Sequence, residues 1–253
     1  MKFLLPSNIY SKIFSFILPG LEGAELVYTG SAVISKQLAE NKGDIALIPS
    51  MDLLNHPDFF ISGRTALSFD GSLSNSYFYF LKQIRMVKEI FLRGDISKNE
   101  AILTKIIFAE QFDTPVDVVL DSKPFELNSR NYLVCGDDNF SGSIFEAGIS
   151  LADQISDMID APYVNYVLAS RNEDLIKEFN TALGGQDKFL EDNYDRIMPR
   201  LGYHQSIMDN IKANLNSIYF DMTDNEKKAL TDLIRLPYFT GITEEINDIK
   251  FVD

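Results

Sequence analysis

Short apolar runs alternate with segments of helical spacing over the first 55 residues, and this alternation constrains the fold more than any other feature of the chain. Residues 2–5, 25–29 and 44–48 have the length and apolar content of strands. Between them, residues 10–18 and 31–41 place apolar side chains at helical spacing. A strand–helix–strand order favours βαβ units and a partly parallel sheet. The chain is therefore predicted to be an α/β protein.

The middle of the chain predicts a second lobe inserted into the first. Strand-like runs at 76–80, 89–92, 116–120 and 132–135 surround one amphipathic helix, and a strong strand at 163–169 precedes a helical end. We predict a first lobe of residues 1–84 and 171–253 and an inserted second lobe of residues 85–170. Two crossings between lobes form a hinge, and ligands of open α/β sheets bind beyond the carboxyl ends of strands. We therefore expect a small molecule between the lobes, at strand-end loops.

Charge and composition exclude several classes of protein. The net charge of −14 would repel nucleic acid and anionic membrane surfaces. The single cysteine, Cys135, leaves no internal disulfide, and no Cys/His cluster suggests a metal or other cofactor. Residues 1–5 imitate the start of a signal peptide, but Pro6 interrupts the apolar run and no small-residue cleavage site follows. We expect a cytoplasmic protein, a monomer or homodimer, whose partner is a small-molecule ligand.

Several different short motifs follow one another along the chain in a defined order. They are residues 43–50 (GDIALIPS), 68–71 (SFDG), 133–137 (LVCGD), 161–164 (APYV), 238–242 (YFTGI) and 249–251 (IKF). In this order and spacing they resemble the menaquinone-biosynthesis proteins of the futalosine route. That resemblance implies the two-lobed fold of type II periplasmic binding proteins, with a ligand cleft between the lobes.

Two enzymes of that family differ after the strand that here ends at Cys135. One dehydrates chorismate to an enolpyruvyl ether of hydroxybenzoate, and the other cleaves a cyclic futalosine derivative with a histidine base at this place. This chain has Asp137 and Asp138 there, and its two histidines, His56 and His204, lie elsewhere. The resemblance therefore implies a chorismate-dehydratase-like lyase. The alternative is a diverged, non-catalytic small-molecule-binding protein of the same fold.

The candidate catalytic residues are Asn8, Ser68 and Asp137. Asn8 follows the first strand, where the dehydratase carries a cleft asparagine, although a simple turn residue is the alternative. Ser68 opens a polar cluster before a very apolar strand. Asp137 is a candidate general base, because paired carboxylates in a closed cleft raise one pKa. Helix capping is the other interpretation of Asp137.

The candidate substrate-binding residues are Ser7, Ser50, Asp70, Gly71, Ser72, Ser97, Lys98 and Asn99. Asp70-Gly71 is equally typical of a β-turn.

In the dehydratase, the segment matching 97–100 reads approximately Ser-Arg-Thr-Ser and suits a substrate carboxylate, whereas Ser97-x-x-Glu100 is a capping-box pattern. Like charges about 4 Å apart cost about 4 kcal/mol at an effective dielectric of about 20, more than the ~0.3–1 kcal/mol from a helix dipole. Glu100 therefore opposes binding of a dicarboxylate here, and Lys98 offsets part of the effect.

Overall fold

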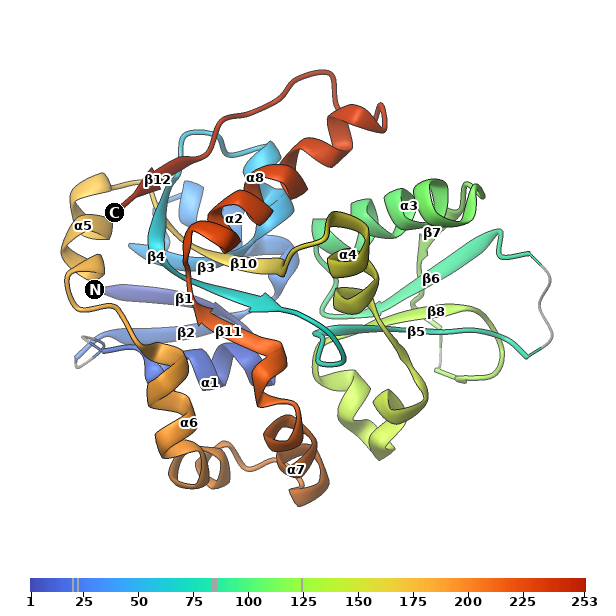
Figure 1. The fold of residues 1–253 in the computed structure, drawn as a ribbon, viewed down its shortest axis with the longest axis horizontal. Helices are drawn as coiled ribbons and strands as arrows, with labels where there is room; N and C mark the ends of the chain where they lie inside the picture. The colour runs from blue at the N-terminus through green and yellow to red at the C-terminus, as the bar shows by residue number, and fades with distance from the viewer. Residues whose placement is uncertain (20, 22, 83–85, 124) are drawn as a thin grey trace.

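Two β-sheets form two lobes in the computed structural model, which describes residues 1–19, 21, 23–82, 86–123 and 125–253 (Figure 1). The larger sheet contains β1 (Lys2–Pro6), β2 (Glu25–Thr29), β3 (Ile45–Pro49), β4 (Phe60–Phe69), β10 (Tyr163–Ser170), β11 (Ile218–Asp221) and β12 (Lys250–Val252). Its order is β11-β4-β10-β3-β1-β2, with β12 beside β4. The smaller sheet has the order β7-β6-β8-β5-β9. Its strands are β5 (Ser76–Tyr79), β6 (Glu89–Gly94), β7 (Asp117–Leu120), β8 (Tyr132–Cys135) and β9 (Ile149–Ser150).

The parallel centre of the larger sheet confirms the predicted α/β class. Strand β1 pairs in parallel with both β2 and β3, through the helices α1 (Ile9–Ile17) and α2 (Ser31–Ala39). All five residues of β3 are buried, as expected of a parallel strand covered on both faces. The returning strand β10 runs antiparallel between β3 and β4. The carboxyl ends of β1, β2 and β3 therefore meet at one edge of the sheet.

The remaining helices cover the two sheets. Those of the larger lobe are η1 (Ser50–Leu54), α5 (Glu173–Asn180), α6 (Gln186–Ile197), η3 (Met198–Leu201), α7 (Gln205–Ala213), η4 (Leu215–Ser217) and α8 (Asp224–Phe239). Those of the smaller lobe are α3 (Lys98–Phe112), η2 (Gly136–Ala147) and α4 (Leu151–Ile159). No helix in the described ranges is long and apolar enough to cross a membrane.

The two lobes divide the chain at different residues from the predicted ones. The chain leaves the larger sheet at residues 70–75, between β4 and β5, and returns through α4 into β10. Strand β5 thus belongs to the smaller sheet, although we placed residues 1–84 in the first lobe, and β10 belongs to the larger sheet, although we placed it in the second. The predicted boundary at 84/85 itself lies outside the described residues. Both strands are fully buried, so their sequences carry no sign of which sheet they pair with.

Candidate functional site

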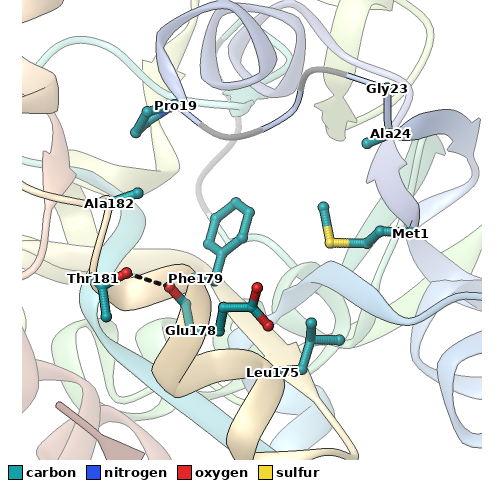
Figure 2. A pocket seen from close by; sticks show the side chains of 9 residues that line it. All are labelled: Met1, Pro19, Gly23, Ala24, Leu175, Glu178, Phe179, Thr181 and Ala182. Atoms are coloured by element: carbon teal, nitrogen blue, oxygen red, sulfur yellow. Dashed lines mark hydrogen bonds between the residues drawn. The ribbon is translucent and has the colours of Figure 1, made fainter.

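One pocket of about 530 Å³ lies at the amino ends of β1 and β2, away from the predicted loops (Figure 2). Glu178 and Thr181 contribute polar groups to its walls, beside apolar side chains that include Met1, Leu175 and Phe179. The Thr181 hydroxyl at its edge is occupied, because it donates to the Glu178 carbonyl at 2.7 Å. No predicted site residue lines this pocket. Among its described lining residues Glu178 has the one charged side chain, so the pocket offers few of the convergent polar groups that fix a ligand's orientation.

The opposite edge of the larger sheet carries the predicted loops, and there the two lobes are hydrogen-bonded to each other. Helices α1, α2 and η1 begin directly after β1, β2 and β3, so their first backbone N–H groups all face the smaller lobe. A side chain of the smaller lobe accepts from the first turn of each helix: Asp137 for α1, Asp95 for α2 and Asn99 for η1. We call these three contacts and the helix starts that they join the interlobe seam.

Asp137 makes the most extensive of these contacts. Its Oδ1 accepts from the Ile9 backbone N–H at 2.8 Å. Its Oδ2 accepts from the Tyr203 hydroxyl and lies 3.4 Å from Lys12 Nζ. All three partners belong to the larger lobe. Both carboxylate oxygens of Asp137 are therefore engaged in hydrogen bonds or an ion pair with these groups. In this closed arrangement Asp137 is not free to act as a base.

Asp95 follows β6, and local backbone geometry holds it against the larger lobe. Gly94 has φ 92°, and a Cβ at that position would lie 2.0 Å from the Cys135 carbonyl oxygen. Glycine is therefore required for the close approach. The Asp95 carboxylate accepts from the Ser31 N–H and from the Ser31 hydroxyl, both at 2.7 Å. Burial raises the pKa of Asp95, while the two hydrogen bonds from Ser31 act in the opposite direction.

A chain of hydroxyl and amide groups extends from Asp95 to the first crossover between the lobes. Because the Ser31 hydroxyl donates to Asp95, the Tyr166 hydroxyl donates to Ser31 Oγ, 3.0 Å away. The Asn75 amide Nδ2 in turn donates to the Tyr166 oxygen at 3.2 Å. Burial, together with the nearby Glu100 and Asp95 carboxylates, raises the pKa of the Tyr166 phenol and keeps it neutral.

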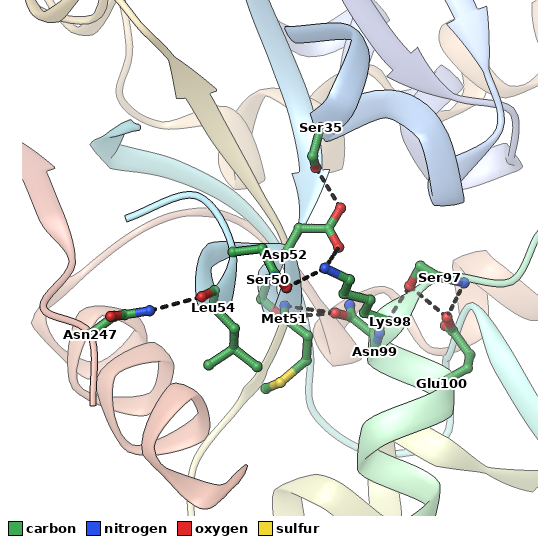
Figure 3. Close-up of polar contacts among 11 residues, drawn as sticks. Ser35, Ser50, Met51, Asp52, Leu54, Ser97, Lys98, Asn99, Glu100 and Asn247 are labelled. Carbon is green, nitrogen blue, oxygen red and sulfur yellow. Dashed lines mark hydrogen bonds and ion pairs between the residues drawn. The ribbon is translucent and has the colours of Figure 1, made fainter. Parts of the chain in front are cut away.

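Asn99 joins α3 to η1 at the third contact (Figure 3). Its Oδ1 accepts from the Met51 N–H at 2.8 Å and lies 3.4 Å from the Ser50 hydroxyl. Its Nδ2 donates to the Asn165 carbonyl of β10 at 2.7 Å. Beside it, Lys98 donates to Asn55 and lies 4.0 Å from the buried Asp52 carboxylate. Each polar atom of the Asn99 amide therefore bonds the larger lobe.

Glu100 lies inside the smaller lobe and does not enter the seam. Its Oε2 accepts from the Ser97 N–H at 2.8 Å and the Ser97 hydroxyl at 2.6 Å (Figure 3), and its Oε1 accepts from the Ser76 hydroxyl of β5 at 3.0 Å. The predicted capping box is thereby confirmed. Burial raises the pKa of Glu100, which these hydrogen bonds oppose. A carboxylate of the chain itself thus occupies the amino end of α3.

Several fully buried polar atoms of α1's cap, the first crossover and strands β4 and β10 have no partner in the described part of the chain. They are Asn8 Nδ2, Ser68 Oγ, Asn75 Oδ1, the Tyr163 hydroxyl and both amide atoms of Asn165. Buried polar groups are normally hydrogen-bonded, so atoms of this kind are positions at which water or a ligand would bind.

The structure brings four of the predicted residues together. Asn8, Ser50, Asn99 and Asp137 all lie at the seam, and Asn8 also caps α1 by accepting from the Ser11 N–H at 2.9 Å. Exposed Ser7 lies beside them on the same strand end. Ser97 serves the α3 cap, and Lys98 reaches η1.

The other predicted binding residues lie on the first crossover and point elsewhere. Asp70 is exposed and lines a separate pocket with α4 and α8. The Gly71 carbonyl accepts from the Ser150 hydroxyl at 3.0 Å, and the Ser72 hydroxyl donates to Asn214 at 2.9 Å. These three residues therefore lie outside the interlobe seam.

The side chains that join the lobes and were not among the candidates include those of Lys12, Ser31, Asp95 and Tyr203. A signal for one of them exists, because Gly30-Ser31 follows a strand and opens a helix as Pro49-Ser50 does. The described residues contain no group of three or more His, Cys, Asp or Glu side chains that would hold a metal ion.

Comparison with known proteins places the fold. No protein-family model matches the chain, and no curated protein matches it in sequence. Among solved structures, protein AF1704 from Archaeoglobus fulgidus shares 14% identity and a TM-score of 0.72 over 96% of this chain and 98% of that one. The Candida albicans CA3427 gene product, described as having the generic periplasmic binding protein fold, shares 11% identity and a TM-score of 0.62 over 97% of this chain and 91% of that one. The alkanesulfonate-binding protein SsuA from Xanthomonas axonopodis pv. citri, bound to MOPS, shares 10% identity and a TM-score of 0.65 over 98% of this chain and 96% of that one. With this strand order and these similarities, the chain has the two-lobed type II periplasmic-binding-protein fold.

Proposed function

We propose that this protein binds a small molecule between its two lobes, at the interlobe seam. The observation that carries the proposal is that three helix starts of one lobe each receive a hydrogen bond acceptor from the other. Opening the lobes would free these backbone N–H groups together with Asp95, Asn99 and Asp137. A ligand that contacts both sets would then shift the population towards its own closed state.

Two further features support this proposal. The unpartnered atoms of Asn75, Tyr163 and Asn165 supply additional donors and acceptors beside the seam. The fold is also that of SsuA, which was solved with a small sulfonic acid bound. A lobe-closing fold with convergent polar groups is typical of small-molecule recognition.

A thermal-shift screen against small polar metabolites tests the proposal. A ligand at a hundred times its Kd stabilises the folded state by about 2.7 kcal/mol, which gives a clear rise in Tm. Asn99→Ala should weaken that response, because it removes the contacts with Met51 and Asn165. The matched control is Ala182→Leu, which narrows the pocket of Figure 2 and should leave the response unchanged. A thermal-shift response that Ala182→Leu weakens and Asn99→Ala leaves unchanged would instead place the ligand in that pocket.

A chorismate-dehydratase-like lyase of menaquinone biosynthesis is the second candidate. The ordered motifs support it, as do the buried, partly unpartnered side chains of Asn8 and Ser68. Eliminating water requires a base for a ring proton, and Asp137 would have to release Tyr203 and Lys12 to serve. We rank this candidate second for that reason.

Incubation with chorismate separates the two candidates. The lyase would form an enolpyruvyl ether of hydroxybenzoate, detectable by mass spectrometry, and Asn8→Ala would reduce its formation. A protein that only binds would return the chorismate unchanged.

A further inference from the structure

We propose that Asp95 and Asp137 are tethered anions: they occupy the amino ends of α2 and α1, hold the lobes together without a ligand, and exclude free anions from those two positions. The first part of this proposal concerns the protein alone. The exclusion of anions rests on the proposed function, because it concerns which ligand enters the seam.

The amino end of a helix attracts anions, because its first N–H groups have no partner within the helix and the dipole is positive there. In α1 and α2, carboxylates of the opposite lobe take that place, at 2.8 Å from the Ile9 nitrogen and 2.7 Å from the Ser31 nitrogen. Each carboxylate thus makes the contact that a bound anion would make. It differs from a free anion in being covalently attached to the other lobe.

This attachment turns anion binding into lobe closure. Hydrogen bonds to charged groups are among the stronger ones in proteins, so loss of one carboxylate should shift the closed-to-open ratio roughly ten- to a hundredfold. Asp137 is held by three groups of the larger lobe, Ile9, Lys12 and Tyr203, and should have the larger effect.

The same carboxylates determine which ligands can enter. A second anion about 4 Å from Asp95 would be disfavoured on the order of a thousandfold at an effective dielectric of about 20. No cation offsets this at Asp95, whose partners in the described residues are the Ser31 N–H and hydroxyl. The Lys12 ammonium near the seam is already paired with Asp137.

The neighbouring Asp138 provides a matched control. It carries the same charge one residue away, its side chain is 55% exposed, and its ion-pair partner Arg93 lies in its own lobe at 4.0 Å. A change at Asp138 alters the net charge without touching the larger lobe.

Pulsed EPR between the lobes tests the proposal in the ligand-free protein. Spin labels at Lys36→Cys on α2 and Lys105→Cys on α3 report the interlobe distance, because both lysines are exposed and Cys135 is buried. We expect one short distance in this labelled parent and in Asp138→Ala, and an added longer distance in Asp95→Ala and Asp137→Ala. Adding sodium formate, which supplies a carboxylate that is not attached to the smaller lobe, should leave the longer distance in the two seam variants and change nothing in the parent.

Two results would overturn the proposal. One is a distance distribution in both seam variants that is identical to that of the parent. The other is a full return of the seam variants to the short distance in formate, since covalent attachment to the smaller lobe would then not be needed for closure. Circular dichroism checks the fold of each variant, and Asp137→Asn replaces Asp137→Ala if the latter does not fold. Because no metabolite is used, failure of the proposed ligand binding leaves these readouts intact.

Discussion

Replacing Glu100 by alanine should destabilise the protein by about 2–4 kcal/mol. The change leaves the buried Ser97 N–H without its acceptor, which is the glutamate half of the capping box and costs about 1–3 kcal/mol. The one buried methylene that is lost, Cγ, adds about 0.8 kcal/mol. Relief of the buried charge, evident in the raised pKa of Glu100, offsets part of this sum.

Two further variants isolate the cause. Glu100→Gln keeps the size and an acceptor for Ser97, so we expect a loss below about 1 kcal/mol. Glu226→Ala removes the corresponding glutamate of the α8 capping box, where Thr223 supplies the partners and, within the described residues, no strand adds a bond like that of Ser76. It should cost less than Glu100→Ala, about 1–2 kcal/mol.

Urea unfolding measures these differences as midpoint shifts at constant m-value. In a protein of this size, Glu100→Ala should also lower Tm by roughly 5–15 °C. A loss within about 0.5 kcal/mol of zero would refute the reasoning. It would mean that Glu100 is not held by Ser97 and Ser76, and that the amino end of α3 is open to a ligand anion.

Three more predictions follow from particular contacts. Gly94→Ala should destabilise the protein by about 3 kcal/mol or more in urea unfolding, because the added Cβ meets the Cys135 carbonyl oxygen. Gly202 also has a positive φ (73°) but has open space around it, so Gly202→Ala should cost about 1 kcal/mol. Equal losses in the two variants would show that backbone strain alone acts. Burial and the nearby Asp221 raise the pKa of Asp187 to about 6, so its folded-state pKa exceeds its ordinary value and the protein should lose about 2–3 kcal/mol of stability as pH rises from about 4 to about 6. Asp187→Asn should flatten that part of the stability profile, and an unchanged profile would contradict the assignment. Asn99→Ala should speed amide exchange at Met51 by about tenfold or more while leaving Ile9 unchanged, as read by hydrogen exchange; slow exchange at Met51 would show that Asn99 is not its acceptor.

The first half of the larger sheet could be predicted from the chain, because its βαβ units are local in sequence. The pattern of apolar residues in 2–5, 25–29 and 44–48 identifies β1, β2 and β3 within a residue or two. Strand β11 was not predicted. It has four residues between helical segments and forms a strand by pairing with β4, about 150 residues earlier. A local pattern carries no information about such a distant partner.

The candidate site was predictable to the same extent. Ser50 and Asn8 follow strands, and Ser97-x-x-Glu100 specifies its own helix cap, so local rules identified them. Asp95 and Tyr203 act through atoms of the other lobe, and their importance depends on how the lobes meet. The sequence around them gives no sign of that contact.

Hydrogen exchange with a ligand from the metabolite screen tests the central claim most directly, that the interlobe seam is the binding site. We predict altered exchange in peptides containing Ile9, Ser31 and Met51, whose N–H groups bond the opposite lobe, with no change in residues 175–182. Protection confined to the segment 175–182, which contributes five residues to the pocket at the other end of the sheet, with Ile9, Ser31 and Met51 unaffected, would contradict it.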